Sequence, residues 1–361
     1  MTQHILHPGE EVQRPFWSVI VPLYNRRDYL KQCLTSVLEQ YPGPKEMEII
    51  VIDDASKNDM RSFVEDIGGE RVKYIRNSAN LGLYPSTNAA IRQARGNWLH
   101  ILHDDDWVLP GFYAAMRRGV ESLPESVGVG FSMYRNEFEG RGSSSHLQFR
   151  SNPGLMGRSF LAMLARENPL QIPAVIYRRE TFARVGLFRE DIPFTADWEW
   201  YVRSAREFSW YHEPTVLACY RVHASNQTHD LRDSGRRARD IRHTIEIFAR
   251  ILPADMIGRV VPYVRQLHAC RFLGFALVYA ENGKPQTAAR YLLEALALDP
   301  DTLLRPEFAK LLQSQALPSL RLNVSQMRFS TNAAARALYL AETEHPGRRN
   351  ATHYKIASDQ A

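Results

Sequence analysis

The chain is poor in cysteine and lacks a long apolar run. Three cysteines, Cys33, Cys219 and Cys270, are spread over 361 residues without a CxxC pair, which argues against a disulfide framework and a cysteine-based zinc site. No segment supplies the ~20 apolar residues of a membrane span. Residues 1–17 also lack the basic start and apolar stretch of a secretion signal. We therefore expect a cytoplasmic protein.

Two signatures of nucleotide binding are also missing. No GxGxxG follows the first apolar run, which argues against an NAD-dependent dehydrogenase, and the lack of GxxxxGK[ST] argues against a P-loop kinase. The net charge of +5 is modest, and arginine is concentrated in one stripe formed by Arg232, Arg236, Arg237, Arg239 and Arg242. This arginine stripe indicates either a solvated helix face or a surface for anionic lipid head groups or an acidic acceptor. We do not expect nucleic acid as a partner.

What is present is the composition of a soluble folded protein, with 44% hydrophobic and 24% charged residues. The length fits one large α/β domain and a smaller appendage. We expect an N-terminal extension over 1–16, the α/β domain over 17–230, an all-helical C-terminal appendage over 231–345 and a disordered tail over 346–361. Within the α/β domain, the polar, Gly- and Ser-containing stretch 138–157 is typical of a mobile loop.

Strand and helix patterns alternate through the first part of the chain. Short apolar runs at 18–21, 48–52, 72–75 and 98–102 are separated by segments with helical periodicity. Continuously apolar strands are typical of a parallel sheet that is buried on both faces. The pattern therefore predicts an α/β fold with a doubly wound, mostly parallel sheet.

The later part of the chain continues with two further expected strands and then becomes helical. The strands are expected at 127–133 and 172–177. Within the helical appendage, residues 273–296 have the pattern of a single tetratricopeptide-like hairpin. Because about three repeats are needed to bury a continuous core, we expect this hairpin to act as a local cap.

Three consecutive carboxylates, Asp104, Asp105 and Asp106, follow the apolar run that ends at Leu102. Adjacent carboxylates repel one another, so a hard cation that neutralises them is the first hypothesis. Open α/β sheets bind ligands beyond the carboxyl ends of their strands, which favours this position. Oxygen ligands indicate Mg²⁺ or Mn²⁺. The alternative is a solvated acidic turn before the next helix.

Polar residues also follow the first two expected strands. Tyr24 offers a flat face for a base, and Asn25 supplies a donor and an acceptor, although an ordinary turn explains them equally. Asp53 or Asp54 is placed to accept a hydrogen bond from a base or a ribose hydroxyl. These two aspartates also suit a helix start capped by Ser56, and both roles are compatible.

Asp197 lies between aromatic residues, with Trp198 and Trp200 beside it. A carboxylate against aromatic surface loses hydration, which raises its pKa toward the range of a general base. An indole face also suits stacking on a sugar ring. The alternative is a helix-start aspartate beside core tryptophans. Further along, His223 is a candidate metal ligand or phosphate donor.

The order of these motifs resembles the family 2 glycosyltransferases of the inverting, GT-A-fold type. The resemblance covers about residues 17–228. It rests on Val19–Asn25, Ile52–Ser56, Asn80–Gly82, Asn88, Ala94, Gly96, Asp104–Asp106, Val185–Phe188, Asp197–Glu199 and Tyr220–His223.

The resemblance implies a division of labour within the α/β domain, with a nucleotide-sugar half at 17–106 and an acceptor and base half at 107–230. It implies that Asp197 is the catalytic base, that Asp105, Asp106 and His223 hold Mn²⁺ or Mg²⁺, and that Trp107 and Trp198 contact the acceptor. The residues implied to bind the nucleotide sugar are Pro22, Leu23, Tyr24, Asn25, Asp53, Asp54, Asn80, Gly82, Asn88 and Asp104.

Two positions depart from the family's pattern. The metal motif is commonly Asp-x-Asp-Asp, and here His103 takes the place of its first aspartate. The base commonly lies in a Glu-Asp pair, and here the pair reads Ala196-Asp197. The frame of the metal motif within the triplet, and thus which aspartate contacts the metal, stays open.

The function that the resemblance implies is metal-dependent, inverting transfer of a sugar from a nucleotide-diphosphate sugar, UDP-sugar first, to a hydroxyl acceptor. The expected setting is assembly of a bacterial surface polysaccharide or lipid-linked glycan. Peripheral contact of the basic helical region with the inner membrane face and a homo-oligomer are further expectations. The alternatives are a nucleotidyltransferase on the same type of sheet, which usually shows a Gly-rich signature absent here, and a non-catalytic carbohydrate-binding module.

Overall fold

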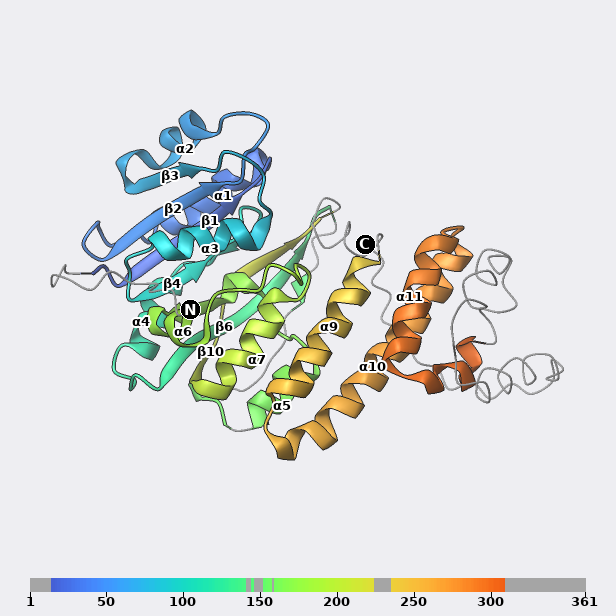
Figure 1. Cartoon of the computed structure of the whole chain (residues 1–361). Coiled ribbons are helices and arrows are strands. Elements are labelled where there is room, and N and C mark those ends of the chain that lie inside the picture. Colours follow the sequence, from blue (N-terminus) through green and yellow to red (C-terminus); the bar gives the residue numbers. More distant parts are fainter. Residues whose placement is uncertain (1–13, 141–143, 146–151, 158, 224–234, 309–361) are drawn as a thin grey trace. The chain divides into compact units, whose positions relative to one another are not determined.

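The computed structural model describes residues 14–140, 144–145, 152–157, 159–223 and 235–308 (Figure 1). The chain divides into two compact units, a first unit over residues 1–223 and a second unit over 224–361. The expected boundary at 230, the expected tail at 346–361, nearly all of the expected extension at 1–16 and much of the expected loop at 138–157 lie outside the described residues.

One mixed sheet organises the first unit. Its strand order is β3-β2-β1-β4-β9-β6-β10-β5, with β7 paired to β6 and β8 paired to β10. The strands are β1 Trp17–Leu23, β2 Met47–Asp53, β3 Val72–Arg76, β4 Trp98–Ile101, β5 Trp107–Val108, β6 Val127–Phe138, β7 Ser144–Ser145, β8 Gly154–Leu155, β9 Val175–Arg178 and β10 Ser209–Val222. The strands β1 to β4 run parallel, as their apolar sequences predict.

The other half of the sheet is mixed in direction. Strand β9 runs antiparallel to both β4 and β6, while β10 runs parallel to β6 and antiparallel to β5. The strand expected at 172–177 begins with a 3-10 turn, η2 Ile172–Ala174, and becomes extended only at Val175. Pro173 explains this shift, because it has no N–H to donate to a strand ladder.

Helices cover both faces of the sheet, so the expected α/β, doubly wound arrangement is confirmed. They are α1 Arg27–Leu38, α2 Arg61–Gly68, α3 Leu83–Gln93, α4 Phe112–Val120, α5 Ser159–Arg166, α6 Arg179–Val185 and α7 Ala196–Glu207, with a 3-10 turn η1 Gly69–Arg71.

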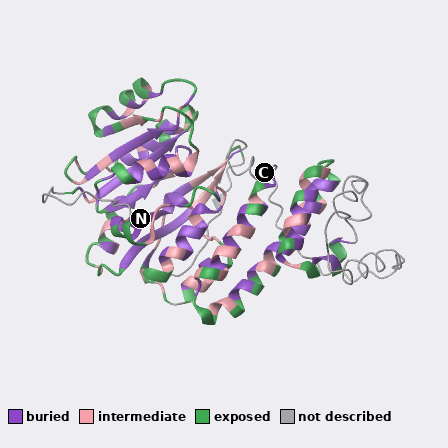
Figure 2. Cartoon of the chain, in the orientation of Figure 1, coloured by how far each residue is buried: buried purple, intermediate pink, exposed green. Residues whose placement is uncertain are grey.

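Alternate side chains of each strand serve the two layers of helices. On one face, Val19 and Val21 share a core cluster with Leu34 of α1. On the other face, the ring of Tyr177 lies 5.4 Å from that of Phe182 in α6 and 5.1 Å from that of Trp200 in α7, measured between centroids. The buried strands between exposed helix surfaces are visible in Figure 2.

The parallel register brings three loops to one edge of the sheet. Leu23 at the end of β1 is paired with Asp53 at the end of β2, and Ile20 is paired with Ile101 at the end of β4. The loops that follow these strands therefore emerge side by side, with the acidic triplet in the loop after β4. This edge carries most of the residues that the sequence singles out.

The second unit is helical in its described residues, with α9 Arg236–Ile251, α10 Ala254–Glu281, α11 Pro285–Leu298 and a 3-10 turn η3 Pro300–Leu304. Helices α10 and α11 pack against each other, and their assignment as a tetratricopeptide-like cap stays a prediction. The rings of Tyr279 and Tyr291 stack between them with centroids 5.5 Å apart, and Pro285 suits the first position of α11. Within the described residues, no helix has the length and apolar character needed to cross a membrane.

Arg237 and Arg242 of the arginine stripe make contacts within the second unit. Arg242 forms ion pairs with Glu246 at 2.6 Å and with Glu294 at 2.5 Å. The guanidinium of Arg237 lies 5.3 Å from the ring centroid of Phe275. Arg232 lies outside the described residues. These contacts favour an intramolecular role for this part of the stripe.

The turn after β2 generates a prediction about stability. Ala55 has a φ of +58°, in the left-handed region, which costs an L-residue roughly 1–2 kcal/mol. Glycine removes this cost but loses about 0.5–1 kcal/mol through its freer unfolded chain. We therefore expect Ala55→Gly to raise the free energy of unfolding by about 0.5–1 kcal/mol, measured by urea denaturation. Ala89→Gly in α3 is the matched control, with an expected loss of about 1 kcal/mol; a similar loss at Ala55 would contradict the argument.

Candidate functional site

The acidic triplet, Asp104 to Asp106, is buried at the edge of the sheet. Its residues are 4%, 4% and 1% exposed, respectively. Burying a charged carboxylate is costly unless the charge is paired and hydrogen-bonded. The contacts of the triplet therefore decide what this edge of the sheet can bind.

Groups from the loop after β1 and from the end of β10 converge on Asp104 and Asp105. Arg26 Nη1 lies 3.2 Å from Asp104 Oδ1 and also contacts Asp105 Oδ2. The backbone N–H of Tyr24 donates to Asp104 Oδ2 at 3.1 Å, and His223 Nε2 donates to Asp105 Oδ2 at 3.0 Å. The triplet thus ties the loop after β1 to the end of β10.

Asp106 is satisfied at one oxygen only. Its Oδ1 accepts a hydrogen bond of 2.9 Å from the backbone N–H of Arg221, whereas its buried Oδ2 has no hydrogen-bond partner among the residues described. Burial and the neighbouring Asp105 charge hold the pKa of Asp106 well above its usual range. A buried carboxylate oxygen in this state could serve as a ligand for a cation.

The other two carboxylates ionise differently. Burial, followed by the charge of Asp105, raises the pKa of Asp104 to about 7. Burial opposes ionisation of Asp105 as well, yet the hydrogen bond from His223 and the charge of Arg26 outweigh it and lower the Asp105 pKa. Asp105 is therefore the most acidic member of the triplet.

The residues present fit a divalent cation. One ligand atom from each of His103, Asp105 and Asp106 lies within 4.8 Å of the others. Burial lowers the pKa of His103, which favours the neutral imidazole that metals bind. Carboxylate oxygens with one imidazole suit Mn²⁺, and the oxygens suit Mg²⁺. The predicted set named His223 in place of His103; in the structure His223 contacts the Asp105 oxygen, and its ligand role stays a prediction.

Arg221 lies between two aromatic rings and donates a hydrogen bond to the backbone of the triplet. The Arg221 guanidinium carbon lies 4.6 Å from the ring centroids of both Tyr29 and Trp107. Its Nε donates to the backbone oxygen of Asp105 at 2.9 Å. The ring of Trp107 packs against Arg221, and its predicted contact with an acceptor stays a prediction. Nothing in the local sequence pattern of Arg221 indicates this contact.

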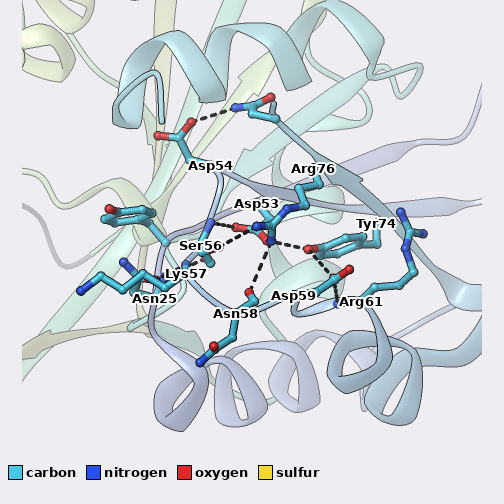
Figure 3. Close-up of polar contacts among 12 residues, drawn as sticks. Asn25, Asp53, Asp54, Ser56, Lys57, Asn58, Asp59, Arg61, Tyr74 and Arg76 are labelled. Carbon is cyan, nitrogen blue, oxygen red and sulfur yellow. Dashed lines mark hydrogen bonds and ion pairs between the residues drawn. The ribbon is translucent and has the colours of Figure 1, made fainter. Parts of the chain in front are cut away.

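The loop after β2 is organised around Asp53, which is fully buried. Asp53 Oδ1 accepts from the backbone N–H of Ser56 at 2.8 Å, while Oδ2 accepts from Tyr74 Oη at 2.5 Å and from Arg76 Nη1 at 2.6 Å (Figure 3). Both oxygens are thus engaged within the protein. These contacts favour a positioning role for Asp53, and its predicted contact with a nucleoside is untested.

Asp54 fastens the loop that leads into α3. Its Oδ1 accepts from Asn77 Nδ2 and from the backbone N–H of Leu81, each at 2.9 Å, and its Oδ2 accepts from the Gly82 N–H at 2.8 Å. Asn80 Nδ2 donates to the Asp54 backbone oxygen at 3.3 Å. Gly82 has a φ of +95°, which favours glycine there. Asp54, Asn80 and Gly82 therefore form one hydrogen-bonded structure, and their binding of a nucleotide sugar stays a prediction.

The loops after β1 and β2 are joined through Asn25. Its backbone N–H donates to Ser56 Oγ at 2.9 Å, and its Oδ1 accepts from the Lys57 N–H at 2.8 Å. Asn25 itself has a φ of +60°, a strained conformation of the kind found at functional sites. Beside it, Tyr24 is 45% exposed, so its ring is available to a ligand.

Three other predicted donor-site residues have little exposed surface. Pro22 and Leu23 are buried members of β1. Asn88 is 1% exposed, and its Nδ2 donates to the backbone oxygen of Phe188 and to Glu190 Oε1, each at 2.9 Å. Its Oδ1 accepts from the Phe188 N–H at 3.2 Å. Asn88 thus joins α3 to the segment after α6, which favours a positioning role.

Asp197 is the second residue of α7 and has the shifted pKa that its neighbours predict. Burial raises the pKa to about 6, while hydrogen bonds to the ionised form restrain the rise. These bonds are the Trp198 N–H to Oδ1 at 2.7 Å and Asn168 Nδ2 to Oδ2 at 2.9 Å. Asn168 Oδ1 accepts from the Leu170 N–H at 3.2 Å, which fixes the orientation of the amide. The sequence analysis did not identify Asn168.

Tyr84 in α3 lies within the electrostatic range of Asp197. Burial raises the pKa of Tyr84 well above its usual range, and the charge of Asp197 adds to the effect, with a smaller contribution from Tyr220. Tyr84 lies in α3, two residues after Gly82, and Tyr220 precedes Arg221 in β10. The charge of Asp197 therefore acts on a residue of α3, the helix whose first turn Asp54 holds through Gly82.

Trp198 belongs to the core. Its side chain is 3% exposed, and its Nε1 donates to the backbone oxygen of Leu164 at 2.5 Å. Trp200 is fully buried as well. A ring without exposed surface has no face to offer a sugar, so the predicted acceptor contact of Trp198 is corrected to a packing role.

Comparison with solved structures identifies the fold. The crystal structure of S. aureus TarS residues 1–349 in complex with UDP-GlcNAc aligns with a TM-score of 0.61 at 16% identity, covering 87% of this chain and 93% of that chain. The mannosyltransferase PcManGT from Pyrobaculum calidifontis, solved with GDP-Man and Mn²⁺, aligns with a TM-score of 0.51 at 20% identity, covering 92% of this chain and 87% of that chain. At these identities the likeness shows the fold alone, and it confirms the GT-A type.

Comparison of sequences identifies the family. The profile described as glycosyl transferase family 2 matches residues 18–184, which include the edge loops and the acidic triplet. An uncharacterized protein of Mycobacterium tuberculosis (strain CDC 1551 / Oshkosh) is 31% identical over 227 residues, which cover 60% of this chain and 70% of that protein. The chain belongs to glycosyl transferase family 2.

Proposed function

We propose that the chain is a divalent-metal-dependent, inverting glycosyltransferase that moves a sugar from a UDP-sugar to a hydroxyl group of a glycan or lipid-linked acceptor. The observation that carries the proposal is the buried acidic triplet with an unsatisfied Asp106 oxygen, placed beside the exposed ring of Tyr24. The UDP-GlcNAc complex of TarS and the Mn²⁺ complex of PcManGT, proteins of the same fold, support this choice of donor and cation.

The donor side of the proposed site uses residues at the edge of the sheet. Tyr24 offers its ring to the nucleoside base, and Asp104 fixes the backbone of Tyr24 through the 3.1 Å hydrogen bond. Asp105 and Asp106, with His103 or His223, would hold Mn²⁺ or Mg²⁺. When bound, such a cation supplies charge that stabilises a departing diphosphate.

The acceptor side uses Asp197 as a general base. With a pKa of about 6, its carboxylate is mostly ionised at neutral pH and still basic enough to take a proton from a hydroxyl in the transition state. The hydroxyl oxygen forms a bond to the anomeric carbon while the bond from that carbon to the diphosphate oxygen breaks. The proton passes to Asp197 and UDP leaves. One displacement inverts the anomeric configuration and needs no second carboxylate nucleophile.

The alternative classes have less support. Membership of glycosyl transferase family 2 favours sugar transfer over nucleotidyl transfer. A non-catalytic carbohydrate-binding module on the Asp197 side would need exposed aromatic faces, and Trp198 and Trp200 are both buried. We propose assembly of a bacterial surface polysaccharide or related glycan as the setting, with membrane contact and self-association as expectations.

Replacing the proposed base tests the acceptor side. We expect Asp197→Asn to lower kcat at least 100-fold, because general base catalysis contributes roughly 10²–10⁴-fold. The affinity for UDP, measured by calorimetry, is expected to stay close to that of the parent protein. Asp191→Asn is the matched control, since that carboxylate is 60% exposed and paired with Arg189 on the surface. Near-normal turnover of Asp197→Asn would remove it as the base.

The pH dependence of turnover tests the same residue independently. The base acts only when ionised, and its pKa is raised from 3.8 to about 6. At saturating donor and metal, kcat is therefore expected to fall about tenfold per pH unit below pH ~6 and to level off above pH ~7. Asn168→Ala removes a hydrogen bond that favours the ionised form, so its acid limb should move to higher pH. A flat profile between pH 5 and 7 is the opposing result.

Removal of a proposed metal ligand tests the donor side. We expect Asp105→Ala to eliminate the part of UDP binding that depends on Mn²⁺, because it removes the most acidic carboxylate of the site. The measurement is a UDP titration with Mn²⁺ and with EDTA. Asp28→Ala, an exposed acidic residue in the first turn of α1, is the control. An unchanged Mn²⁺ dependence in Asp105→Ala would refute the assignment.

A further inference from the structure

Arg26 lies between Tyr24, which is proposed to contact the nucleoside base, and Asp105, which is proposed to bind the cation. It directly follows the loop of Tyr24 and Asn25 and precedes α1. Its Nη1 contacts Asp104 Oδ1 at 3.2 Å and, more closely, Asp105 Oδ2. The Arg26 side chain is 24% exposed, so it is partly desolvated and keeps some contact with solvent.

Arg26 alone does not balance a fully ionised triplet. Full ionisation would give three negative charges, whereas the Arg26 guanidinium contributes one positive charge, and the pKa values of Asp104 and Asp106 are accordingly raised. The guanidinium of Arg221 is directed at the Asp105 backbone oxygen and at Gln32. A divalent cation beside Arg26 would complete the balance, but it would also place two cationic groups on Asp105.

We propose that Arg26 is the internal counter-cation of the acidic triplet, and that it moves from Asp105 to the donor diphosphate when a divalent cation binds. This inference rests on the proposed function and adds to it a residue that couples metal binding to donor binding. The coupling follows from competition for Asp105, since His103, Asp105 and Asp106 are the residues that fit the cation.

The chemistry of the guanidinium suits both partners. Arginine presents a planar fork that binds carboxylates and phosphates bidentately, and it remains charged at all relevant pH values. Arg26 lies between Tyr24, proposed for the base, and Asp105, proposed for the cation. A diphosphate that joins these two positions would pass within reach of its fork.

The adjacent arginine provides an internal comparison. Arg27 is exposed, and its guanidinium carbon lies 4.4 Å from the ring centroid of Phe63 in α2. It carries the same charge one residue away but packs on an aromatic ring. A variant at Arg27 therefore matches the loss of charge at Arg26 without the carboxylate contacts.

A thermodynamic consequence distinguishes this role from a structural one. Without diphosphate, Arg26 opposes the cation, so Mn²⁺ alone binds weakly. With UDP present, Arg26 has a second anionic partner, and the opposition is relieved. UDP should therefore tighten Mn²⁺ binding, and Mn²⁺ should tighten UDP binding by the same factor.

The test is a Mn²⁺ titration of the full chain, followed by the electron paramagnetic resonance signal of free Mn²⁺, with and without UDP. We expect Arg26→Gln to bind Mn²⁺ alone roughly tenfold more tightly, because a positive charge next to the site is removed. The same variant should bind UDP more weakly, and the factor by which UDP tightens Mn²⁺ should fall, while direct contact between the diphosphate and Mn²⁺ keeps it above one. Arg27→Gln should match the parent protein in all three quantities.

A second variant at Arg26 distinguishes the positive charge of the side chain from the planar shape of its guanidinium. It also remains informative if Arg26→Gln fails to fold. Arg26→Lys keeps the charge but loses the fork. It should bind Mn²⁺ alone like the parent protein and show a reduced coupling with UDP. An Arg26→Gln protein whose affinity for Mn²⁺ alone is unchanged or weaker, or an Arg26→Lys protein with full coupling, would overturn the inference.

Failure of the inference and failure of the proposed function give different results. If the parent protein binds neither Mn²⁺ nor UDP, the proposed function fails, and the inference fails with it. If the parent protein shows coupled binding and both Arg26 variants behave like Arg27→Gln, the proposed function stands and only the role of Arg26 is refuted.

Discussion

The burial of three adjacent carboxylates at the end of β4 is the constraint on which the rest of the site depends. Repulsion between them must be offset by groups that reach in from other elements. Arg26 and the backbone of Tyr24 come from the loop after β1, whereas His223 and the backbone of Arg221 come from the end of β10. These segments are far apart in sequence. The triplet therefore connects the parallel half of the sheet to the mixed half through its hydrogen bonds and ion pairs. Asp106 Oδ2, which has no hydrogen-bond partner among the described residues, is the position that we propose for a cation.

On the proposed donor side, some residues support the loops and others are exposed to a ligand. Asp53 and Asp54 use their oxygens to hold the loops that follow β2 and precede α3. Tyr24 is the exposed group that these loops leave at the surface. Asp197 has an equivalent support, since Asn168 and the start of α7 stabilise its ionised form while burial opposes it. The site therefore consists of a few available groups on a framework of satisfied polar contacts.

The sequence predicted the parallel half of the sheet because apolar strands buried on both faces leave a clear pattern, and it predicted the raised pKa of Asp197 from its aromatic neighbours. Contacts of Arg26 and Arg221 with the triplet join residues separated by 78 to 116 positions, so no local pattern could reveal them. The direction of β9 depends on its neighbours β4 and β6, which sequence periodicity does not specify. The acceptor contact predicted for Trp198 lacks an exposed ring, which the sequence could not show because an aromatic residue beside an aspartate has the same sequence pattern whether it is exposed or buried.

A crystal structure of the chain with Mn²⁺ and UDP, with the metal located by its anomalous scattering, tests the central claim most directly. The account predicts an anomalous peak within coordination distance of the Asp105 and Asp106 carboxylates, with the UDP diphosphate on that ion and the uracil ring against Tyr24. A metal and nucleotide bound away from this edge of the sheet, with the Asp106 oxygen still without a partner, would contradict it.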